Sequence, residues 1–336
     1  MSGYGAAGFT REDIRRGLED SRGWPAAHGG KYMKKRGSAS VSKMHKQGPY
    51  HLMLLPGMVL LFIFHLVPMV GLIMAFEDFM PIKGLFGSKF VGLANFQRLF
   101  KLPTFWRILR NTIIISVGKL LLVMVASVIF ALLLNECRHV KLKRVIQTSV
   151  YLPHFLSWVI LAVMFSNIFS YTGIVSQLVQ LFGGEPEMFM ISNTWFRKIL
   201  IGGEVWKEFG YGAIVYIAAI TNIDPTMYEA ASMDGAGRWK QIWYITLPSI
   251  VPTIILMTTL NIGKLLKGGF DQVFNLYSPL VYETGDIIDT YVYRMGLVDL
   301  QYSNGTAVGL FQSLIGFVLL VIAYKLADKL VGYRVF

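Results

Sequence analysis

The stretch "EAASMDGAGRWKQIWYITLP", residues Glu229 to Pro248, lies between two apolar runs that are each long enough to cross a membrane. It is polar and patterned where a plain connecting loop would be enough. Just before it, Asp224 can cap a helix and Pro225 fits the first helical position, because a proline has no N–H that would be left unpaired there. The pattern therefore predicts a short helix from Pro225 to about Met233.

The second half of the stretch contains its own signals. Asp234-Gly235 is typical of a turn. A second short helix, "GRWKQIWYI", can follow, and Leu247-Pro248 is expected to break the chain before the next membrane segment begins. We therefore expect a helix-turn-helix that lies across the membrane surface, within a loop that covers residues 224–248.

This loop combines small and large apolar residues. Ala230, Ala231 and Gly235 would let a helix approach another surface closely, and larger anchors flank them: Met227, Tyr228, Trp239 and Trp243. Such a surface suits a helix that docks into a groove of a partner protein. It also suits an amphipathic helix that rests on lipid. The residues alone leave both interpretations open.

The composition indicates an integral membrane protein. Of 336 residues, 54% are hydrophobic and only 15% are charged, against about 25% charged in a typical soluble chain. The net charge of +12 fits loops that face anionic lipid better than it fits nucleic-acid binding. Cys137 is the single cysteine, so an intramolecular disulfide is excluded, and no histidine pair has metal-ligand spacing.

Six segments have membrane length, since about 20 mostly apolar residues span the hydrocarbon core. They run approximately over Leu52–Phe76, Ile113–Leu134, Val145–Phe169, Val205–Ile220, Ile250–Leu266 and Val308–Ala327. We therefore expect an all-α protein with a basic, flexible tail over residues 1–49 and a transmembrane domain over residues 50–336.

Lysine and arginine placement predicts the orientation. The tail holds ten of these residues, and the loop from Arg138 to Arg144 holds four more. In all, nineteen lie on the side of both termini and of the 224–248 loop, and nine lie on the opposite side. Cytoplasmic loops carry the excess of positive charge. We therefore expect a protein of the bacterial inner membrane, with both termini and the 224–248 loop on the cytoplasmic side.

The 224–248 loop resembles the "EAA---G---------I-LP" signature of permease subunits in bacterial ABC importers. Every fixed position of the signature is filled at the family's spacing: Glu229, Ala230, Ala231, Gly235, Ile245, Leu247 and Pro248. In that family the loop is the coupling helix, seated in a cleft of the cytoplasmic ATPase. The resemblance therefore implies that these residues, with Asp234 in the turn, couple the permease to ATP hydrolysis, and we call residues 224–248 the coupling loop.

Further stretches are similar to the LplB-type branch of this family, which serves oligosaccharide and polysaccharide uptake and is related to the maltose-system permeases. They are "LMLLPGMVLLFIFHLVPMVGLIMAFEDF", "FVGLANFQRLF", "QTSVYLPHFLSWVI" and "GFDQVFNLYSPLVYETGDIIDTYVYRMGL". The similarity covers about residues 50–330. It implies the MetI-like permease fold, with six transmembrane helices and a cytoplasmic coupling helix.

The resemblance also implies a divided machine. The sequence contains no G-x-x-x-x-G-K-[ST] phosphate loop, so we expect no cofactor on this chain and ATP-Mg on partner subunits. The expected partners are a second homologous permease, two ABC ATPases, an extracytoplasmic solute-binding protein, an oligosaccharide and membrane lipid. A secondary transporter or channel without an ATPase is the alternative, but it leaves the coupling loop unexplained. A membrane-embedded enzyme is disfavoured, because no catalytic motif is present.

Polar and aromatic side chains at membrane depth predict a substrate pathway, since sugars bind to aromatic faces and hydrogen-bonding groups. The candidates are Trp206, Lys207, Tyr211, Asn261, Lys264, Lys267, Phe270, Asp271, Asn275 and Tyr277. The alternative is that the lysines extend to the membrane interface and the aromatics form interfacial belts.

Lys264 and Lys267 are three residues apart on the predicted fifth helix, so they are expected to share one helix face. A basic face could receive the carboxylate of a uronic acid, which makes alginate and pectin fragments candidate cargoes. Lys264 could instead pair with an acidic side chain, such as Asp271 or one from the second permease.

Overall fold

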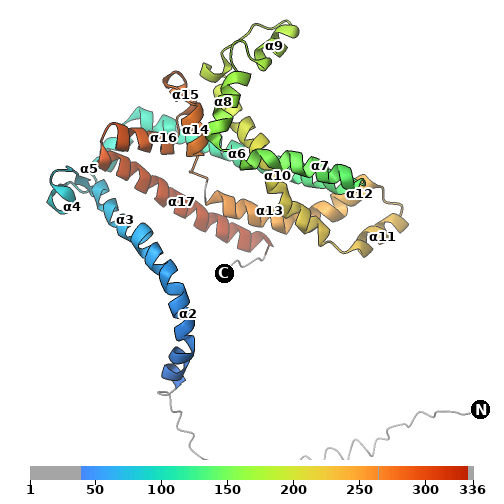
Figure 1. Ribbon diagram of the computed structural model, residues 1–336, viewed down its shortest axis with the longest axis horizontal. Helices are drawn as coiled ribbons and strands as arrows, with labels where there is room; N and C mark the ends of the chain where they lie inside the picture. Colours follow the sequence, from blue (N-terminus) through green and yellow to red (C-terminus); the bar gives the residue numbers. More distant parts are fainter. Residues whose placement is uncertain (1–38, 264, 332–336) are drawn as a thin grey trace, which may run out of the picture. The chain divides into compact units, whose positions relative to one another are not determined.

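The computed structural model describes residues 39–263 and 265–331 (Figure 1). This part of the chain is mostly helical, in agreement with the all-α prediction. Two short strands, β1 (Glu77–Asp78) and β2 (Lys89–Phe90), pair in antiparallel fashion and form the one sheet within the described residues. Helices predominate because hydrocarbon offers no partner for backbone polar groups, which a helix pairs internally.

The chain up to His65 forms a unit of its own. Its described residues belong to α2 (Ala39–Leu61) and to a π-helical turn, Phe62–Leu66, which continues into the second unit. The predicted basic tail, residues 1–49, lies outside the described residues as far as residue 38. Its last eleven residues, 39–49, are part of α2.

The second unit, from Leu66 onward, holds the remaining helices. In chain order they are α3 (Val67–Met69), α4 (Gly84–Gly87), α5 (Ala94–Phe100), α6 (Pro103–Glu136), α7 (Val140–Tyr151), α8 (Trp158–Ile168), α9 (Ile174–Leu181), α10 (Phe196–Thr221), α11 (Pro225–Met233), α12 (Arg238–Gln241), α13 (Leu247–Ile262), α14 (Phe270–Leu276), α15 (Tyr282–Gly285), α16 (Ile288–Tyr293) and α17 (Tyr302–Val331). Short 3-10 turns link several of them: Val70–Phe76, Leu152–Phe155, Phe189–Ile191 and Pro279–Val281. Two further π-helical turns cover Ile242–Thr246 and Arg294–Val298.

Four helical stretches within the described residues are long and apolar enough to cross a membrane: Tyr50–Phe76, Pro103–Glu136, Arg238–Ile262 and Tyr302–Lys329. The pair Val140–Phe155 and Trp158–Ile168 makes a fifth if it counts as one broken span. The remaining predicted segment corresponds to α10. Its 26 residues are long enough to cross, at about 1.5 Å of rise per residue, although charged side chains interrupt its apolar surface.

The third predicted segment, Val145–Phe169, is not one continuous helix. The chain bends by 103° between Phe155 and Trp158. Pro153 lies in a 3-10 turn, Leu156 and Ser157 have extended backbones, and the Ser157 hydroxyl caps α8 by accepting the N–H of Ile160 at 3.4 Å. The apolar run therefore continues in the sequence while the helix breaks, because proline weakens the helix and a new cap restarts it.

The predicted start of the fourth segment, near Val205, is also wrong. Helix α10 begins at Phe196, nine residues earlier. The charged residues Glu204, Lys207 and Glu208 lie near the start of the predicted segment but in the interior of the observed helix. Apolarity could not predict the true start, because these charges find partners inside the protein instead of in water.

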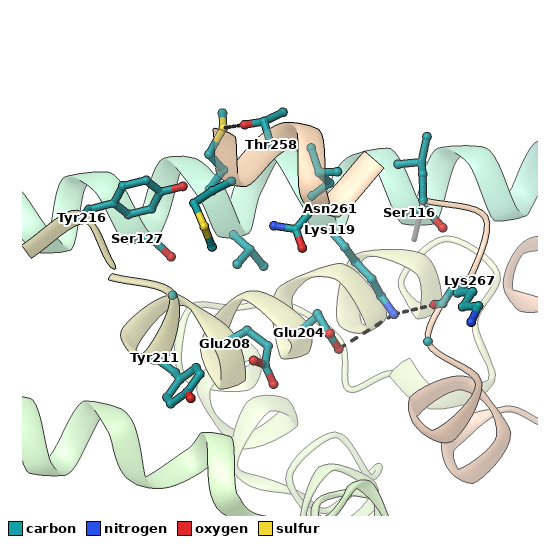
Figure 2. A pocket seen from close by; sticks show the side chains of 18 residues that line it. Ser116, Lys119, Ser127, Glu204, Glu208, Tyr211, Tyr216, Thr258, Asn261 and Lys267 are labelled. Carbon is teal, nitrogen blue, oxygen red and sulfur yellow. Dashed lines mark hydrogen bonds and ion pairs between the residues drawn. The ribbon is translucent and has the colours of Figure 1, made fainter. Parts of the chain in front are cut away.

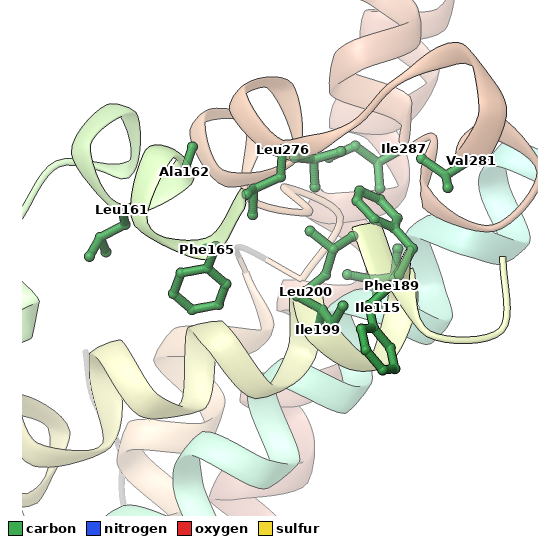
Figure 3. Close-up of a cluster of buried hydrophobic side chains, with 12 residues drawn as sticks. Ile115, Leu161, Ala162, Phe165, Phe189, Ile199, Leu200, Leu276, Val281 and Ile287 are labelled. Atoms are coloured by element: carbon green, nitrogen blue, oxygen red, sulfur yellow. The ribbon is translucent and has the colours of Figure 1, made fainter. Parts of the chain in front are cut away.

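Helix α6 is common to all three hydrophobic clusters of the second unit. Ile115 belongs to the first cluster, with α8, α10 and α14 (Figure 3). Phe105 and Ile108 belong to the second, with α5, α16 and α17. Val128 and Ala131 belong to the third, with α10 and α13. Helix α6 therefore contributes to every cluster, and α10 is the long helix that packs most extensively against it.

Small residues let α6 and α10 lie side by side (Figure 1). A Cβ added to Gly118 would lie 2.8 Å from Ile201 Cδ1, and one added to Gly212 would lie 2.7 Å from Ser127 Oγ. The Ser127 hydroxyl also donates to the backbone oxygen of Phe209 at 2.8 Å. Close packing with an interhelical hydrogen bond is the usual way in which membrane helices associate.

Candidate functional site

The first half of the coupling loop folds as the sequence predicts. Helix α11 covers Pro225–Met233, and the Asp224 carboxylate accepts the N–H of Thr226 at 2.9 Å. That hydrogen bond lowers the pKa of Asp224 below its usual value, because it favours the ionised form. Gly235 then turns the chain with φ of +76°, a conformation in which residues with a Cβ are strained.

The second half differs from the prediction. Leu247-Pro248 does not break the chain, and Arg238–Ile262 forms one continuous helical stretch through α12, a π-helical turn and α13. The π-helical turn, Ile242–Thr246, ends directly before Leu247. A π-helical turn widens the backbone spiral, which gives room to a proline that lacks the N–H of a regular α-helix.

The residues of the EAA signature divide into an exposed and a packed group. Exposed side chains or backbone include Glu229, Ala230, Asp234, Gly235 and Pro248, and the half-buried residues are Ala231, Ile245 and Leu247. Leu247 packs against the third hydrophobic cluster, beside Ile250 and Ile254. The exposed group is therefore accessible to a partner, while the packed group anchors the loop to α13.

A cavity of about 350 Å³ lies between α6, α10 and α13 (Figure 2). Its lining residues are Ser116, Lys119, Leu120, Val123, Met124, Ser127, Glu204, Glu208, Tyr211, Gly212, Tyr216, Met257, Thr258, Asn261, Leu265, Lys267, Gly268 and Gly269. We call it the first cavity. Its walls combine apolar side chains with hydroxyls, an amide and four charged groups, which is a suitable lining for a polar ligand with apolar faces.

Lys119 crosses from α6 toward α10 and the segment after α13 (Figure 2). Its Nζ donates to the backbone oxygen of Gly268 at 2.8 Å and lies 3.9 Å from Glu204 Oε2. The lysine is only 7% exposed. A charge this deep needs partners, so Lys119 ties three separate elements together at one point.

A second charged group lies one helical turn further along α10. Lys207 Nζ donates to the backbone oxygen of His154 at 2.8 Å and to Glu208 Oε1 at 2.9 Å. His154 Nδ1 lies 2.8 Å from Glu208 Oε2, and the His154 ring stacks on Tyr211 at 3.8 Å between centroids. This network joins the bend after α7 to α10.

A second cavity, of about 450 Å³, adjoins the first. It is lined by Trp158, Glu204, Lys267, Gly269, Phe270, Asp271, Gln272, Asp289 and Val292. Glu204, Lys267 and Gly269 line both cavities. Burial raises the pKa of Asp289 above its usual value, although the Gln312 amide donates to this carboxylate at 2.8 Å.

The structure brings five of the proposed pathway residues to the cavities: Tyr211, Asn261, Lys267, Phe270 and Asp271. The others lie elsewhere or serve other contacts. Trp206 packs against Phe165, Lys207 belongs to the network with His154, the Asn275 amide donates to the Asp271 backbone oxygen at 2.7 Å, and the Tyr277 ring packs against Phe274 and Tyr282. Lys264 lies outside the described residues.

The prediction that Lys264 and Lys267 share a helix face is wrong. Helix α13 ends at Ile262, and Lys267 lies in the non-helical segment before α14. The segment leaves the helical path because its backbone is held from outside: Lys119 binds the Gly268 oxygen, and Gly269 has φ of +85°. Lys267 itself is exposed.

Three charged cavity residues are not among the ten pathway candidates, although the sequence marks them as charges at membrane depth: Lys119, Glu204 and Glu208. Glu204 and Glu208 are four residues apart, which places them on one face of α10. Lys119 is an isolated charge in an apolar helix. Both patterns were visible in the sequence. The apolar lining residues, such as Leu120 and Met257, carry no such signal, because they resemble any other lipid-facing or core residue.

Comparison with known proteins extends these observations. Residues 123–333 match the family described as "Binding-protein-dependent transport system inner membrane component". The chain is 41% identical over 306 residues to the polygalacturonan/rhamnogalacturonan transport system permease protein YteP of Bacillus subtilis (strain 168), with 91% of this chain and 95% of that protein covered. It is 40% identical over 295 residues to protein LplB of the same organism, covering 88% and 93%.

The fold is similar to solved transporter structures. One is a crystal structure of a bacterial ABC transporter involved in the import of the acidic polysaccharide alginate, with a TM-score of 0.81 and 36% identity over 87% of this chain and 99% of that chain. Another is the bacterial alginate ABC transporter in complex with an alginate pentasaccharide-bound periplasmic protein, with a TM-score of 0.80 and 36% identity over 88% and 99%.

Proposed function

The chain belongs to the family of binding-protein-dependent transport system inner membrane components, and on this premise we propose that it is the permease of an importer for acidic polysaccharide fragments. The observation that carries the proposal is the likeness, at 36% identity and a TM-score of 0.81, to a transporter that imports alginate. The relative YteP, a polygalacturonan/rhamnogalacturonan transport system permease protein, indicates the same chemical class of cargo.

Within this chain, Lys267 is the residue best placed to meet an acidic sugar. It is exposed and lines both cavities. The other lysine of the first cavity, Lys119, is buried and already bound to Gly268 and paired with Glu204. Lys267 has no hydrogen bond or ion pair with the described residues, although its charge acts on the Asp289 carboxylate in the second cavity. Its amine is therefore the one available to a carboxylate of the cargo.

The cavities also suit neutral parts of a sugar. Asn261 supplies a hydrogen-bonding amide in the first cavity, where the Glu208 carboxylate and the Tyr211 ring are already in contact with His154. In the second cavity, Asp271 supplies a hydrogen-bonding carboxylate and Phe270 an aromatic ring. An acidic oligosaccharide carries both hydroxyls and carboxylates. The polar lining binds the hydroxyls of the sugar, and Lys267 binds a carboxylate.

We further propose that the chain itself hydrolyses no ATP. ATP-Mg is used by two ABC ATPase partners that contact the exposed residues of the coupling loop: Glu229, Ala230, Asp234 and Gly235. A second homologous permease completes the membrane part, and an extracytoplasmic solute-binding protein delivers the cargo. The excess of lysine and arginine supports a cytoplasmic position for both termini and for the coupling loop.

Topology is tested by single-cysteine labelling in intact cells. Cys137 is replaced and a cysteine is placed at Ser232, which is exposed on α11. A membrane-impermeant reagent added outside should not label this position, whereas it should after the membrane is permeabilised. Labelling from outside in intact cells would overturn the proposed orientation.

The cargo is tested with the full complex in proteoliposomes, by initial uptake of labelled alginate, pectin and neutral glucan oligomers. A contact between a lysine and a carboxylate is a charge-assisted hydrogen bond of about 1.5–3 kcal/mol. Lys267→Gln should therefore raise the half-saturating concentration of the acidic oligomer by roughly 10- to 150-fold. Lys83→Gln, at an exposed lysine outside both cavities, is the matched control. Preference of the wild type for neutral glucan, or unchanged acidic uptake in Lys267→Gln, would refute the cargo proposal.

A further inference from the structure

Two hydrogen bonds join α11 to the helix that follows it. On one face, the Tyr228 hydroxyl lies 2.9 Å from Thr246 Oγ1. Thr246 is in the π-helical turn and is only 2% exposed. The contact therefore links the middle of α11 to a buried point of the continuous helical stretch Arg238–Ile262.

The second hydrogen bond comes from Gln241, at the end of α12. Its Nε2 donates to Ser232 Oγ at 2.9 Å and to the Ala236 backbone oxygen at 3.2 Å. The Ser232 hydroxyl in turn donates to the Tyr228 backbone oxygen at 2.8 Å. Tyr228, Ser232 and Gln241 thus form one connected network across the turn at Gly235.

A third contact at the loop has a different character. Arg238 and Glu136 form an ion pair of 3.1 Å, but their side chains are 51% and 35% exposed. Solvent screening leaves such exposed pairs little strength. That pair joins α12 to α6 and leaves α11 to its own two contacts. Of these, the hydrogen bond between Tyr228 and Thr246 is part-buried and the one from Gln241 to Ser232 is exposed, so the first is the stronger link between α11 and the helix that follows.

The helix held in this way reaches the first cavity. From Gln241 to Asn261 it runs without a break, over about 30 Å at 1.5 Å of rise per residue. Met257, Thr258 and Asn261, near its far end, line the cavity. A displacement of α11 can therefore be transmitted along one helix to the cavity wall, provided that α11 cannot slide or rotate against it.

We propose that Tyr228, Gln241 and Thr246 are positioning residues for coupling, because they lock α11 to the helix that lines the cavity. This inference rests on the proposed function, in which α11 contacts the ATPase. Tyr228, Gln241 and Thr246 touch neither nucleotide nor cargo. They determine how much of the ATPase motion reaches the cavity.

The test uses the full complex in proteoliposomes and measures cargo transported per ATP hydrolysed. Tyr228→Phe and Thr246→Val each remove one hydroxyl with little change of shape. Each should lower transport per ATP by roughly two- to tenfold, the range expected for one hydrogen bond. Basal ATPase activity and assembly should be retained. Thr246→Ser keeps the hydroxyl and should restore coupling, which a purely steric role would not predict.

Two further comparisons make the result specific. Tyr244→Phe removes the phenolic hydroxyl of a tyrosine that is 80% exposed on the same helical stretch, and it should behave like the wild type. The double variant Tyr228→Phe/Thr246→Val should lose no more coupling than either single variant, because the two hydroxyls act on each other. Wild-type coupling in both single variants, or additive losses in the double variant, would overturn the inference. Absence of ATP-driven uptake in the wild-type complex would instead overturn the proposed function.

Discussion

Replacing Lys119 by methionine tests whether the buried charge pair holds α6 and α10 together. Methionine fills much of the lysine volume but has no charge. In Lys119→Met, the carboxylate of Glu204 loses the Lys119 ammonium, which lies 3.9 Å from its Oε2 atom. That oxygen has no hydrogen-bond partner within the described part of the chain.

The magnitude follows from this distance. Two unit charges 3.9 Å apart attract by about 4 kcal/mol at an effective dielectric constant of about 20. Removing one partner of a buried pair typically destabilises a protein by about 3–5 kcal/mol. We therefore expect Lys119→Met to lower the apparent melting temperature of the detergent-purified complex by roughly 6–20 °C, at about 2–4 °C for each kcal/mol.

The double variant separates the pair from the hydrogen bond to Gly268. Lys119→Met/Glu204→Gln removes both charges, so it should recover most of the stability lost in Lys119→Met. Lys101→Met, at an exposed lysine before α6, controls for the loss of a lysine as such. If Lys119→Met and the double variant melt at the same temperature, the attraction between Lys119 and Glu204 does not stabilise the helix pair, and the reasoning is wrong.

Three further predictions concern the coupling loop and the helix packing. Gly235→Val should abolish coupled transport, because valine at a φ of +76° strains the backbone by about 1–2 kcal/mol. Gly235→Asn should retain part of the coupled transport. Wild-type transport per ATP in Gly235→Val would contradict this prediction. Gly210→Ala should lower the yield of folded protein, because its Cβ would lie 2.5 Å from the Val150 backbone oxygen, whereas Gly202→Ala has open space and should not; equal yields would refute the close packing. The hydrogen bond from Thr226 lowers the pKa of Asp224 and stabilises α11. This stabilisation is complete at pH values above the usual aspartate pKa of about 3.9 and is lost as pH falls through the lowered pKa. The mobility of a spin label on α11 should therefore rise at low pH in the wild type and less in Asp224→Asn.

The parts of the fold that depend on local signals were predictable from the sequence. The bounds of α11 agree with the prediction because Asp224, Pro225 and Gly235 each act on the neighbouring backbone. The long apolar helices were predictable for a similar reason, since their length alone is sufficient to cross a membrane.

The incorrect predictions share a different cause, since contacts distant in the sequence determine the structure there. The chain bends by 103° before Trp158, although the sequence remains apolar. Helix α13 ends at Ile262, and the segment after it is held by Lys119, which lies about 150 residues earlier in the chain. Neither the bend nor the fixed segment leaves a local pattern that periodicity could detect.

The same contacts indicate which helix can move. Helices α6 and α10 are held to each other by close packing at Gly212, by the hydrogen bond from Ser127, and by the buried pair of Lys119 and Glu204. By contrast, the polar contact between α6 and α13 among the described residues is that of the Thr258 hydroxyl, which lies 3.1 Å from the sulfur of Met124 but also 2.7 Å from the Ile254 backbone oxygen of its own helix. Sulfur is a weak acceptor, so this contact resists displacement little.

The helical stretch Arg238–Ile262 is thus joined to α11 at one end, through Gln241 and Thr246. Its α13 part is joined only weakly to α6 along the cavity. Helix α13 packs mainly against α17 and α10 and meets α6 over a small surface. We therefore expect that a motion imposed on α11 makes α13 slide past α6 more readily than it separates α10 from α6. We therefore expect the wall formed by Met257, Thr258 and Asn261 to be the part of the first cavity that changes during transport. Thr258→Val removes the hydroxyl that contacts Met124 and keeps the shape of the side chain, so it should leave transport per ATP unchanged. A loss of transport per ATP much larger than that in Tyr228→Phe would show that α13 does not slide past α6.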